Sequence, residues 1–192
     1  MPLDYTNGET EHYYAPKNIE ERDRPAPLAT SAQQFPEQHM MAAGFCWNGQ
    51  TQLFFIPTRT KVNADYFIQH VLGPMFAVDV PRLFGRNAHK VLLHTDSASS
   101  HTARKTINWL NSHGMKFITK DEWLPNSPEL APMDYFANGH LKQMMRKGLY
   151  TTARGMIRAA KEEWSKIPLE MFQNALSAWP ERIDLVNKAK GN

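Results

Sequence analysis

The pattern of hydrophobic and polar positions predicts a mixed α/β domain in most of the chain. Two apolar runs, residues 39–47 and 50–56, flank an Asn-Gly pair. Such a pair favours the positive φ angles of a tight turn, so these runs predict a β-hairpin. Residues 90–95 form a short continuous apolar run, which is typical of a strand buried on both faces of a parallel sheet. Residues 115–119 predict another short strand.

Helices are predicted between and after these strands. Asn63 is the expected N-cap of a helix that runs to about Phe76, with a Gly-Pro pair expected to kink it or end it early. Ser99 or Ser100 is expected to cap a second helix. Four further helices are predicted at about residues 133–147, 152–165, 168–178 and 180–189. A hairpin followed by alternating helices and strands is typical of a mixed sheet covered by helices.

The N-terminal part of the chain differs from the rest. It is rich in proline and charge and contains only scattered aromatic residues. Such a segment cannot form a core of its own. We therefore expect an extended arm over residues 1–38 and one globular domain over residues 39–192.

Composition limits the chemistry without choosing a function. Of the 192 residues, 42% are hydrophobic, which is enough for one core. Lys and Arg number 22 against 19 Asp and Glu, and the net charge of +3 is compatible with a polyanionic partner. The single cysteine, Cys46, excludes an internal disulfide and a cysteine zinc cluster. No apolar run approaches the roughly 20 residues of a membrane span, so we expect no membrane partner.

Two aspartates carry the candidate chemistry. Asp96 directly follows the apolar strand, and Asp134 opens a predicted helix after two prolines, with 37 residues between them. Ligands collect at the carboxyl ends of strands in open α/β sheets, and carboxylate oxygens suit Mg²⁺, so two such residues can form a metal-dependent phosphoryl-transfer site. Each also has a structural interpretation. Asp96 can cap a helix or form a turn, and Asp134 can complement a helix dipole.

The sequences around both aspartates form recognisable motifs. They are LHTDSASSHTA at residues 93–103 and WLPNSPELAPMDYF at residues 123–136, of which the second is long and specific. Shorter motifs are WNG, FFI and KVN in the hairpin and the start of the next helix, and WPER at residues 179–182. Together they resemble the catalytic domain of mariner-type transposases of the Tc/mariner superfamily, over roughly residues 12–190.

The resemblance implies an RNase H-like fold in which three acidic residues bind Mg²⁺ or Mn²⁺ and catalyse cut-and-paste DNA transposition. Asp96 would be the second of these catalytic metal ligands and Asp134 the third, in the branch where the third is Asp. DNA would be the partner, the location would be nuclear, a homodimer would be allowed, and no small-molecule cofactor is expected. The arm would correspond to a clamp-like loop that reaches toward a partner subunit or DNA, with a disordered linker as the alternative.

The chain departs from the family pattern at two places. The family follows its second Asp with Asn or Gly and then Ala-Pro, where this chain has Ser97, Ala98 and Ser99. The first catalytic Asp is not evident, since the candidate Asp4 is surrounded by turn-forming residues. We therefore expect the first strand to be partly or wholly missing and the set of carboxylates to be deficient. The family's paired helix-turn-helix modules, which recognise transposon ends, are not evident either.

Three other residues are candidates for support of the site. His101 matches a histidine of the family motif, and His94 stands two residues before Asp96, on the same side of the strand. Glu129 lies in the loop before Asp134. The alternatives are a histidine bonded to the backbone for His101, core packing for His94 and a turn role for Glu129.

Basic residues at helical spacing are candidates for contacts with DNA phosphates. They are Lys142, Arg146, Arg154, Arg158 and Lys161. A solvated helix face is the alternative interpretation.

The leading prediction is a transposase catalytic-domain fragment for metal-dependent DNA cleavage and strand transfer, impaired because the first catalytic Asp is not evident. The alternative is a non-enzymatic, transposon-derived protein that binds nucleic acid or another protein. A different Mg²⁺-dependent nuclease of RNase H-like fold is the third interpretation.

Overall fold

The computed structural model describes residues 2–3, 39–123, 127–146, 148, 150 and 152–189. Most of the predicted arm, together with Asp4, lies outside the described residues. None of the described helices is long and apolar enough to cross a membrane.

The described strands form three small sheets. They are β1 (Pro2–Leu3), β2 (His39–Ala42), β3 (Phe45–Cys46), β4 (Gly49–Gln50), β5 (Phe54–Ile56), β6 (Leu92–Leu93) and β7 (Lys116–Phe117). β1, β2 and β5 form an antiparallel sheet in that order, β3 and β4 form an antiparallel pair, and β6 pairs in parallel with β7. The predicted mixed sheet is thus divided. The described part of β1 is Pro2–Leu3, and it pairs with β2 and with no other described strand.

Helices make up most of the remaining described residues. They are α1 (Ala64–Phe67), η2 (Ile68–Leu72), η3 (Met75–Asp79), α2 (Val80–Phe84), η4 (Gly85–Lys90), α3 (Ser99–Thr102), α4 (Arg104–Ser112), η5 (Pro128–Leu130), η6 (Met133–Ala137), α5 (Asn138–Met145), α6 (Ala153–Lys166), α7 (Leu169–Ser177) and α8 (Trp179–Lys188). Of the η segments, η2, η3 and η6 are π-helical, and η4 and η5 are 3₁₀-helical. The four helices predicted after residue 132 are confirmed to within two residues at each end.

The predicted hairpin is confirmed, but its turn lies one residue earlier than expected. Cys46 pairs with Gly49, so Trp47 and Asn48 form the turn, and of these residues only Gly49 has a positive φ, at 134°. Asn48 donates a hydrogen bond of 2.9 Å to the carbonyl of Leu83, and a Cβ added to Gly49 would lie 3.3 Å from the Leu83 side chain. The hairpin tip is therefore fitted against α2, a tertiary contact that the Asn-Gly pattern does not include.

The first long helix begins where the sequence predicts and ends later. Asn63 caps it, because its Oδ1 accepts a hydrogen bond of 2.9 Å from the backbone of Tyr66. The predicted end near Phe76 is wrong, since the chain stays helical through η2, η3 and α2, and Gly73-Pro74 does not end the helix early. Pro74 lies between two π-helical segments. Wide turns of this kind accommodate a proline that would break a regular α-helix.

Two expectations near the second strand are wrong. The strand predicted over residues 90–95 is reduced to β6, and Leu92 is 59% exposed, because β6 has a strand neighbour on one side only among the described strands. Neither Ser99 nor Ser100 caps the next helix. Ala98 is the N-cap, and the helix is broken into α3 and α4.

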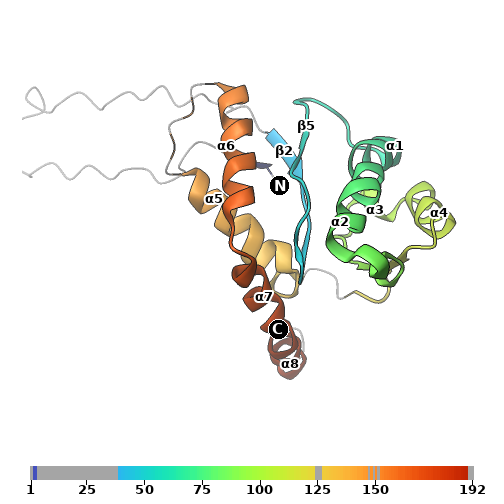
Figure 1. Cartoon of the computed structure of the whole chain (residues 1–192). Coiled ribbons are helices and arrows are strands. Elements are labelled where there is room, and N and C mark those ends of the chain that lie inside the picture. Colours follow the sequence, from blue (N-terminus) through green and yellow to red (C-terminus); the bar gives the residue numbers. More distant parts are fainter. Residues whose placement is uncertain are drawn as a thin grey trace, which may run out of the picture.

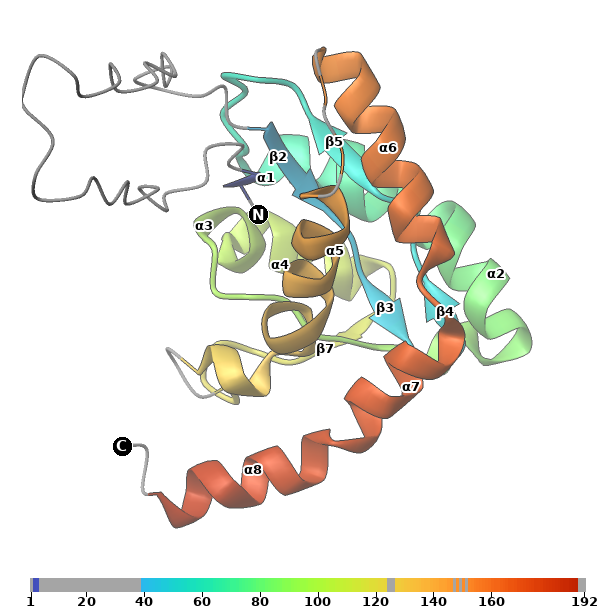
Figure 2. The ribbon, with the colours of Figure 1, turned by 90° about the vertical axis from the view of Figure 1, so that its left-hand side faces the viewer.

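The core lies in two hydrophobic clusters on opposite faces of β2 and β5. Figure 1 shows α5 and α6 on one side of these strands and α1 to α4 on the other. The first cluster includes Trp164 and the fully buried Phe172, and the second includes Phe67 and Leu72. Trp164 also donates a hydrogen bond of 2.7 Å from its ring to the carbonyl of Thr51, which ties α6 to the hairpin. Figure 2 shows the same elements from the side of α5 and α6.

Candidate functional site

Asp96 lies in the turn that connects β6 to α3. Its Oδ1 accepts a hydrogen bond of 3.1 Å from the backbone of Ala98 and lies 2.5 Å from Nδ1 of His101. The contact with His101 holds the pKa of Asp96 below its usual range, although partial burial acts in the opposite direction. The side chain is still 68% exposed. Asp96 therefore does form a turn, yet its carboxylate stays charged and accessible to a ligand.

His101 connects this carboxylate to the second hydrophobic cluster. Its ring packs on Phe67 at a centroid distance of 4.0 Å, and its side chain is only 20% exposed. The ring is thus fixed by packing on one side and contacts Asp96 on the other. This arrangement limits the positions that the Asp96 side chain can take.

Asp134 lies in the first turn of η6. Its backbone N–H donates to the carbonyl of Ala131 at 2.8 Å, and its Oδ1 accepts a hydrogen bond of 3.0 Å from Asn138. The residue is exposed, and a carboxylate in the first helical turn is stabilised by the helix dipole. The position of Asp134 therefore depends on the backbone at Ala131, which connects η5 to Pro132.

His94 lies within electrostatic range of both carboxylates. Burial lowers its pKa, and Asp96 and Asp134 both act in the opposite direction. The ring packs on Trp123 at a centroid distance of 3.8 Å, and its Nε2 is buried with no hydrogen-bond partner in the described part of the chain. Both aspartates therefore influence the protonation of this imidazole, whose ring contacts Trp123.

The donor set fits a hard divalent cation, but it is small. Asp96 and Asp134 offer the oxygen ligands that Mg²⁺ and Mn²⁺ prefer, and the buried Nε2 of His94 needs a polar partner. Among the described residues, no group of three or more His, Cys, Asp and Glu side chains is placed to hold one metal ion.

The segment before Asp134 has contacts that sequence reasoning missed. Glu129 is exposed, and its backbone carbonyl accepts a hydrogen bond of 3.3 Å from Arg182. Arg182 also lies over the ring of Tyr135, with 3.9 Å from the guanidinium carbon to the ring centroid. Burial raises the pKa of the Tyr135 phenol, and Arg182 partly opposes this. WPER is recognisable as a motif, but no local pattern indicates which segment it contacts.

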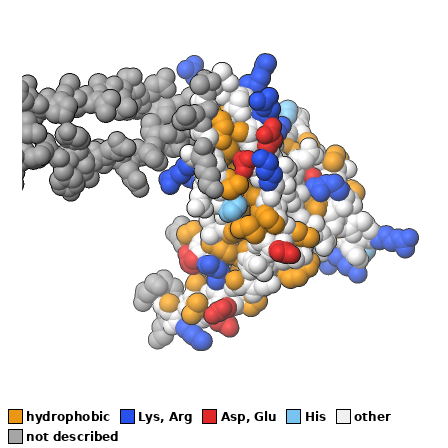
Figure 3. All heavy atoms as spheres, turned by 60° about the vertical axis from the view of Figure 1, so that its left-hand side comes forward, with side chains coloured by type: hydrophobic (Ala, Val, Ile, Leu, Met, Phe, Trp, Pro, Cys, Tyr) orange, Lys and Arg blue, Asp and Glu red, His pale blue; other side chains and the backbone are white. Residues whose placement is uncertain are grey.

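The five predicted basic residues lie on α5 and α6, and all are exposed. Arg158 is within 3.8 Å of Glu162, a distance that gives a weak ion pair at an exposed position. Figure 3 shows Lys and Arg side chains spread over this side of the molecule, separated by hydrophobic side chains, with no single continuous patch.

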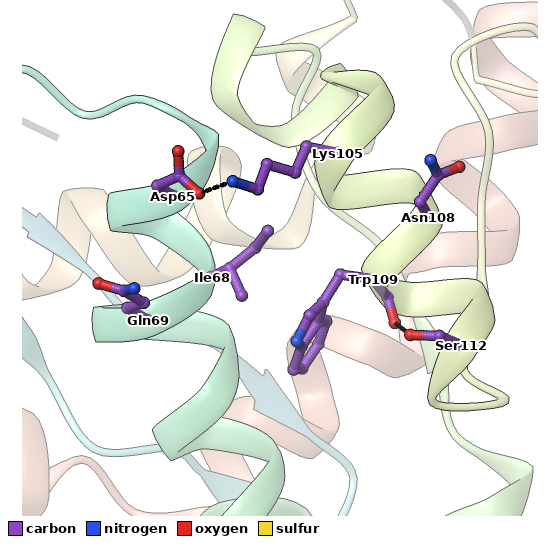
Figure 4. Close-up of a pocket in the computed structure, with 7 residues that line it drawn as sticks. All are labelled: Asp65, Ile68, Gln69, Lys105, Asn108, Trp109 and Ser112. Carbon is purple, nitrogen blue, oxygen red and sulfur yellow. Dashed lines mark hydrogen bonds and ion pairs between the residues drawn. The ribbon is translucent and has the colours of Figure 1, made fainter.

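A pocket of about 510 Å³ lies between the first long helix and α4. Its lining residues are Asp65, Ile68, Gln69, Lys105, Asn108, Trp109 and Ser112. Figure 4 shows Asp65 and Lys105 forming an ion pair at this pocket. None of the predicted site residues lines it, so the candidate chemistry lies outside this pocket.

The fold is RNase H-like, as the sequence predicts, and similarity to solved structures shows this. Several structures of Mos1 mariner transposase are among those that it matches. The Mos1 paired end complex with Mn matches at a TM-score of 0.81 and 18% identity, over 100% of this chain and 54% of that chain. The paired-end complex with the left transposon end matches at 0.74 and 20%, over 93% and 51%. The Mos1 catalytic domain matches at 0.70 and 19%, over 82% and 76%.

These similarities establish the fold. The chain spans about half the length of the transposase chains in the two paired-end complexes. No protein-family model matches the sequence, and no curated protein matches it.

Proposed function

We propose that this chain is the catalytic domain of a mariner-type transposase, acting on DNA through a divalent cation held by Asp96 and Asp134. The observation that carries the proposal is the fold shared with Mos1 transposase, in which Asp96 and Asp134 are both exposed and stand in the two motifs that the sequence singles out. Mos1 structures include complexes with Mn and with Mg and a strand transfer complex. These similarities support both DNA and a divalent cation as partners of this chain.

Each residue of the site has a distinct role in this proposal. Asp96 and Asp134 bind the cation, His101 fixes the Asp96 side chain, and Asn138 orients Asp134. When bound, the cation supplies charge stabilisation at a transferring phosphoryl group. Because the described residues offer only two carboxylates, we propose that the domain binds the cation weakly and cleaves DNA poorly as it stands.

Mn²⁺ binding tests the role of the two aspartates. We expect calorimetry to detect weak binding to the wild-type chain. Asp96→Ala and Asp134→Ala are each expected to weaken it by at least about tenfold, because even outer contacts of metal ligands change affinity by about 10- to 100-fold. Asp184→Ala removes an exposed carboxylate on α8 and is the matched control. Unchanged affinity in both site variants would contradict the proposal.

A plasmid-nicking assay with Mn²⁺ tests the proposed impairment in the same set of proteins. We expect at most traces of nicked product from the wild-type chain. Rapid nicking that is lost in Asp96→Ala and Asp134→Ala would show that the two carboxylates suffice for DNA cleavage. The proposed impairment would then be wrong. DNA binding without cation binding would favour the non-enzymatic alternative.

The exposed basic face of α6 is expected to contribute to DNA affinity. Replacing Arg154, Arg158 and Lys161 together by alanine should reduce the slope of log K against log salt by about 2 to 3, since each phosphate contact contributes roughly 0.9. Fluorescence anisotropy with a duplex at several salt concentrations measures this slope. A control triple variant at the exposed residues Arg86, Lys90 and Lys116 removes the same charge elsewhere. Equal slopes for the two triple variants would contradict a specific contribution of α6. The change in DNA affinity would then reflect only the loss of positive charge.

A further inference from the structure

The segment that carries Asp134 has few strong structural constraints of its own. It consists of a 3₁₀ turn, η5, and a single π-helical segment, η6. Pro128 and Pro132 cannot donate backbone hydrogen bonds, and the local bonds of Leu130 and Ala131 measure 3.1 and 3.2 Å. Short 3₁₀ and π segments have weaker hydrogen-bond geometry than an α-helix. Asp134 itself is held by its 2.8 Å bond to Ala131 and by Asn138, so contacts from outside the segment act mainly on the turn that precedes it.

The two C-terminal helices supply such contacts on both sides of Asp134. Before it, Trp179 donates a hydrogen bond of 2.9 Å from its ring to the carbonyl of Leu130, and Arg182 donates to the carbonyl of Glu129. After it, Tyr135 donates a hydrogen bond of 2.7 Å to the carbonyl of Ala175 in α7. These bonds join groups that are 40 to 53 residues apart in the chain.

Arg182 joins both sides through one side chain. Its guanidinium bonds the Glu129 carbonyl and also lies 3.9 Å from the centre of the Tyr135 ring. A planar guanidinium can donate in its plane and pack on an aromatic ring through its face at the same time, which a lysine ammonium cannot do equally well. The side chain therefore fixes the separation between the residues that flank Asp134.

The position of α8 fits this role better than a role in the core. No residue of α8 is buried, and Leu185 is 57% exposed. Figure 2 shows α8 continuing from α7 along the outer edge of the domain, and its hydrogen bonds from Trp179 and Arg182 reach η5. A helix that buries no residue contributes little to the hydrophobic core, so its contacts with the Asp134 segment are its main interactions.

We propose that α8 is a brace for the metal site, with Trp179 and Arg182 as positioning residues that hold the Asp134 segment in register with Asp96. The inference rests on the proposed role of Asp134 as a metal ligand. Neither Trp179 nor Arg182 contacts the cation or the DNA in this proposal. Both act through the backbone on either side of Asp134.

The sign of one effect separates bracing from electrostatics. Arg182→Ala removes a positive charge near an anionic site, and electrostatics alone would strengthen Mn²⁺ binding or leave it unchanged. Bracing predicts that Arg182→Ala weakens Mn²⁺ binding by about three- to tenfold, in line with changes in the outer contacts of metal ligands. Arg182→Lys keeps the charge and one donor, so it should recover part of the affinity. Trp179→Phe removes the ring N–H and part of the ring but keeps Arg182 in place, so it should weaken binding less than Arg182→Ala.

Lys188→Ala is the matched control, because it removes the same charge from an exposed position on the same helix. Calorimetry with Mn²⁺ on the full chain measures the affinities. Hydrogen exchange without metal provides a second readout. The amides of η5 and η6 should exchange about tenfold faster in Arg182→Ala and Trp179→Phe than in the control, with α6 unchanged.

The outcomes distinguish the two proposals. If the wild-type chain does not bind Mn²⁺, the proposed function fails, and the exchange data alone decide whether the brace exists. If the wild-type chain binds Mn²⁺ and Asp134→Ala loses it, while Arg182→Ala and Trp179→Phe match the control in affinity and exchange, the brace is overturned and the function stands. Stronger binding by Arg182→Ala would assign its effect to charge and also overturn the brace.

Discussion

Phe172→Ala is expected to lower the free energy of unfolding by about 3–5 kcal/mol, the range for removing a buried phenylalanine. Phe172 has no exposed surface. Its ring contacts Phe45 at a centroid distance of 4.8 Å, Trp164 at 5.7 Å and Phe136 at 5.8 Å. Four elements meet at this side chain, so the surroundings cannot collapse into the cavity without moving a helix or a strand. Urea unfolding followed by circular dichroism measures the change.

Leu169→Ala on the same helix is the control for that measurement. Leu169 is 43% exposed, so its removal should change stability by no more than about 0.5 kcal/mol. Phe136 stands two residues after Asp134, so loosening of the aromatic cluster should also disturb the site. A cost below about 1.5 kcal/mol for Phe172→Ala would mean that the packing around this ring is looser than the structure indicates.

Arg82→Ala is expected to destabilise the protein more than Asp79→Asn, although Arg82 is the more exposed partner. The Asp79 side chain is fully buried and lies 2.8 Å from the guanidinium of Arg82, whose side chain is 53% exposed. Removing Arg82 leaves a buried carboxylate with no cation. Breaking a buried pair in this way typically costs about 3–5 kcal/mol. Arg82 also donates a hydrogen bond of 2.7 Å to the carbonyl of Gln50, which would be lost as well.

Asp79→Asn leaves fewer buried polar groups without a partner than Arg82→Ala does. Asn at position 79 keeps an oxygen that can accept the 3.2 Å hydrogen bond now donated by the backbone of Gln52, and the exposed guanidinium of Arg82 can turn to water. We therefore expect Asp79→Asn to cost about 1–2 kcal/mol. Unfolding of both single variants and the double variant at pH 7 gives the coupling energy. An equal or larger cost for Asp79→Asn would contradict this account of the pair.

Local signals in the sequence were sufficient for several elements. The N-cap at Asn63 and the four C-terminal helices were predicted because capping, proline and apolar periodicity act within a few residues. The hairpin was predicted for the same reason. The errors arose where the tertiary structure overrides a local preference. The hairpin turn contacts Leu83, the helix continues past Pro74 through π-helical segments, and one side of β6 is exposed.

Some features of the candidate site were also predictable from local sequence, and others were not. Asp96 and Asp134 stand out in the sequence because each lies in a distinctive motif. His101 was identified from its place in the motif, while its packing on Phe67 was not predictable because Phe67 belongs to another helix. The basic residues were found from helical spacing, but spacing gives no information on whether they form one surface.

The sequence by itself determined the order of the elements, the two aspartates and the likeness of their motifs to those of mariner-type transposases. These features depend on residue type and short spacing. Only the tertiary structure decided that Asp96 contacts His101 and that Trp179 and Arg182 contact the segment that carries Asp134. Contacts between residues 40 to 53 positions apart depend on how helices and strands pack, and no local pattern in the chain specifies that packing.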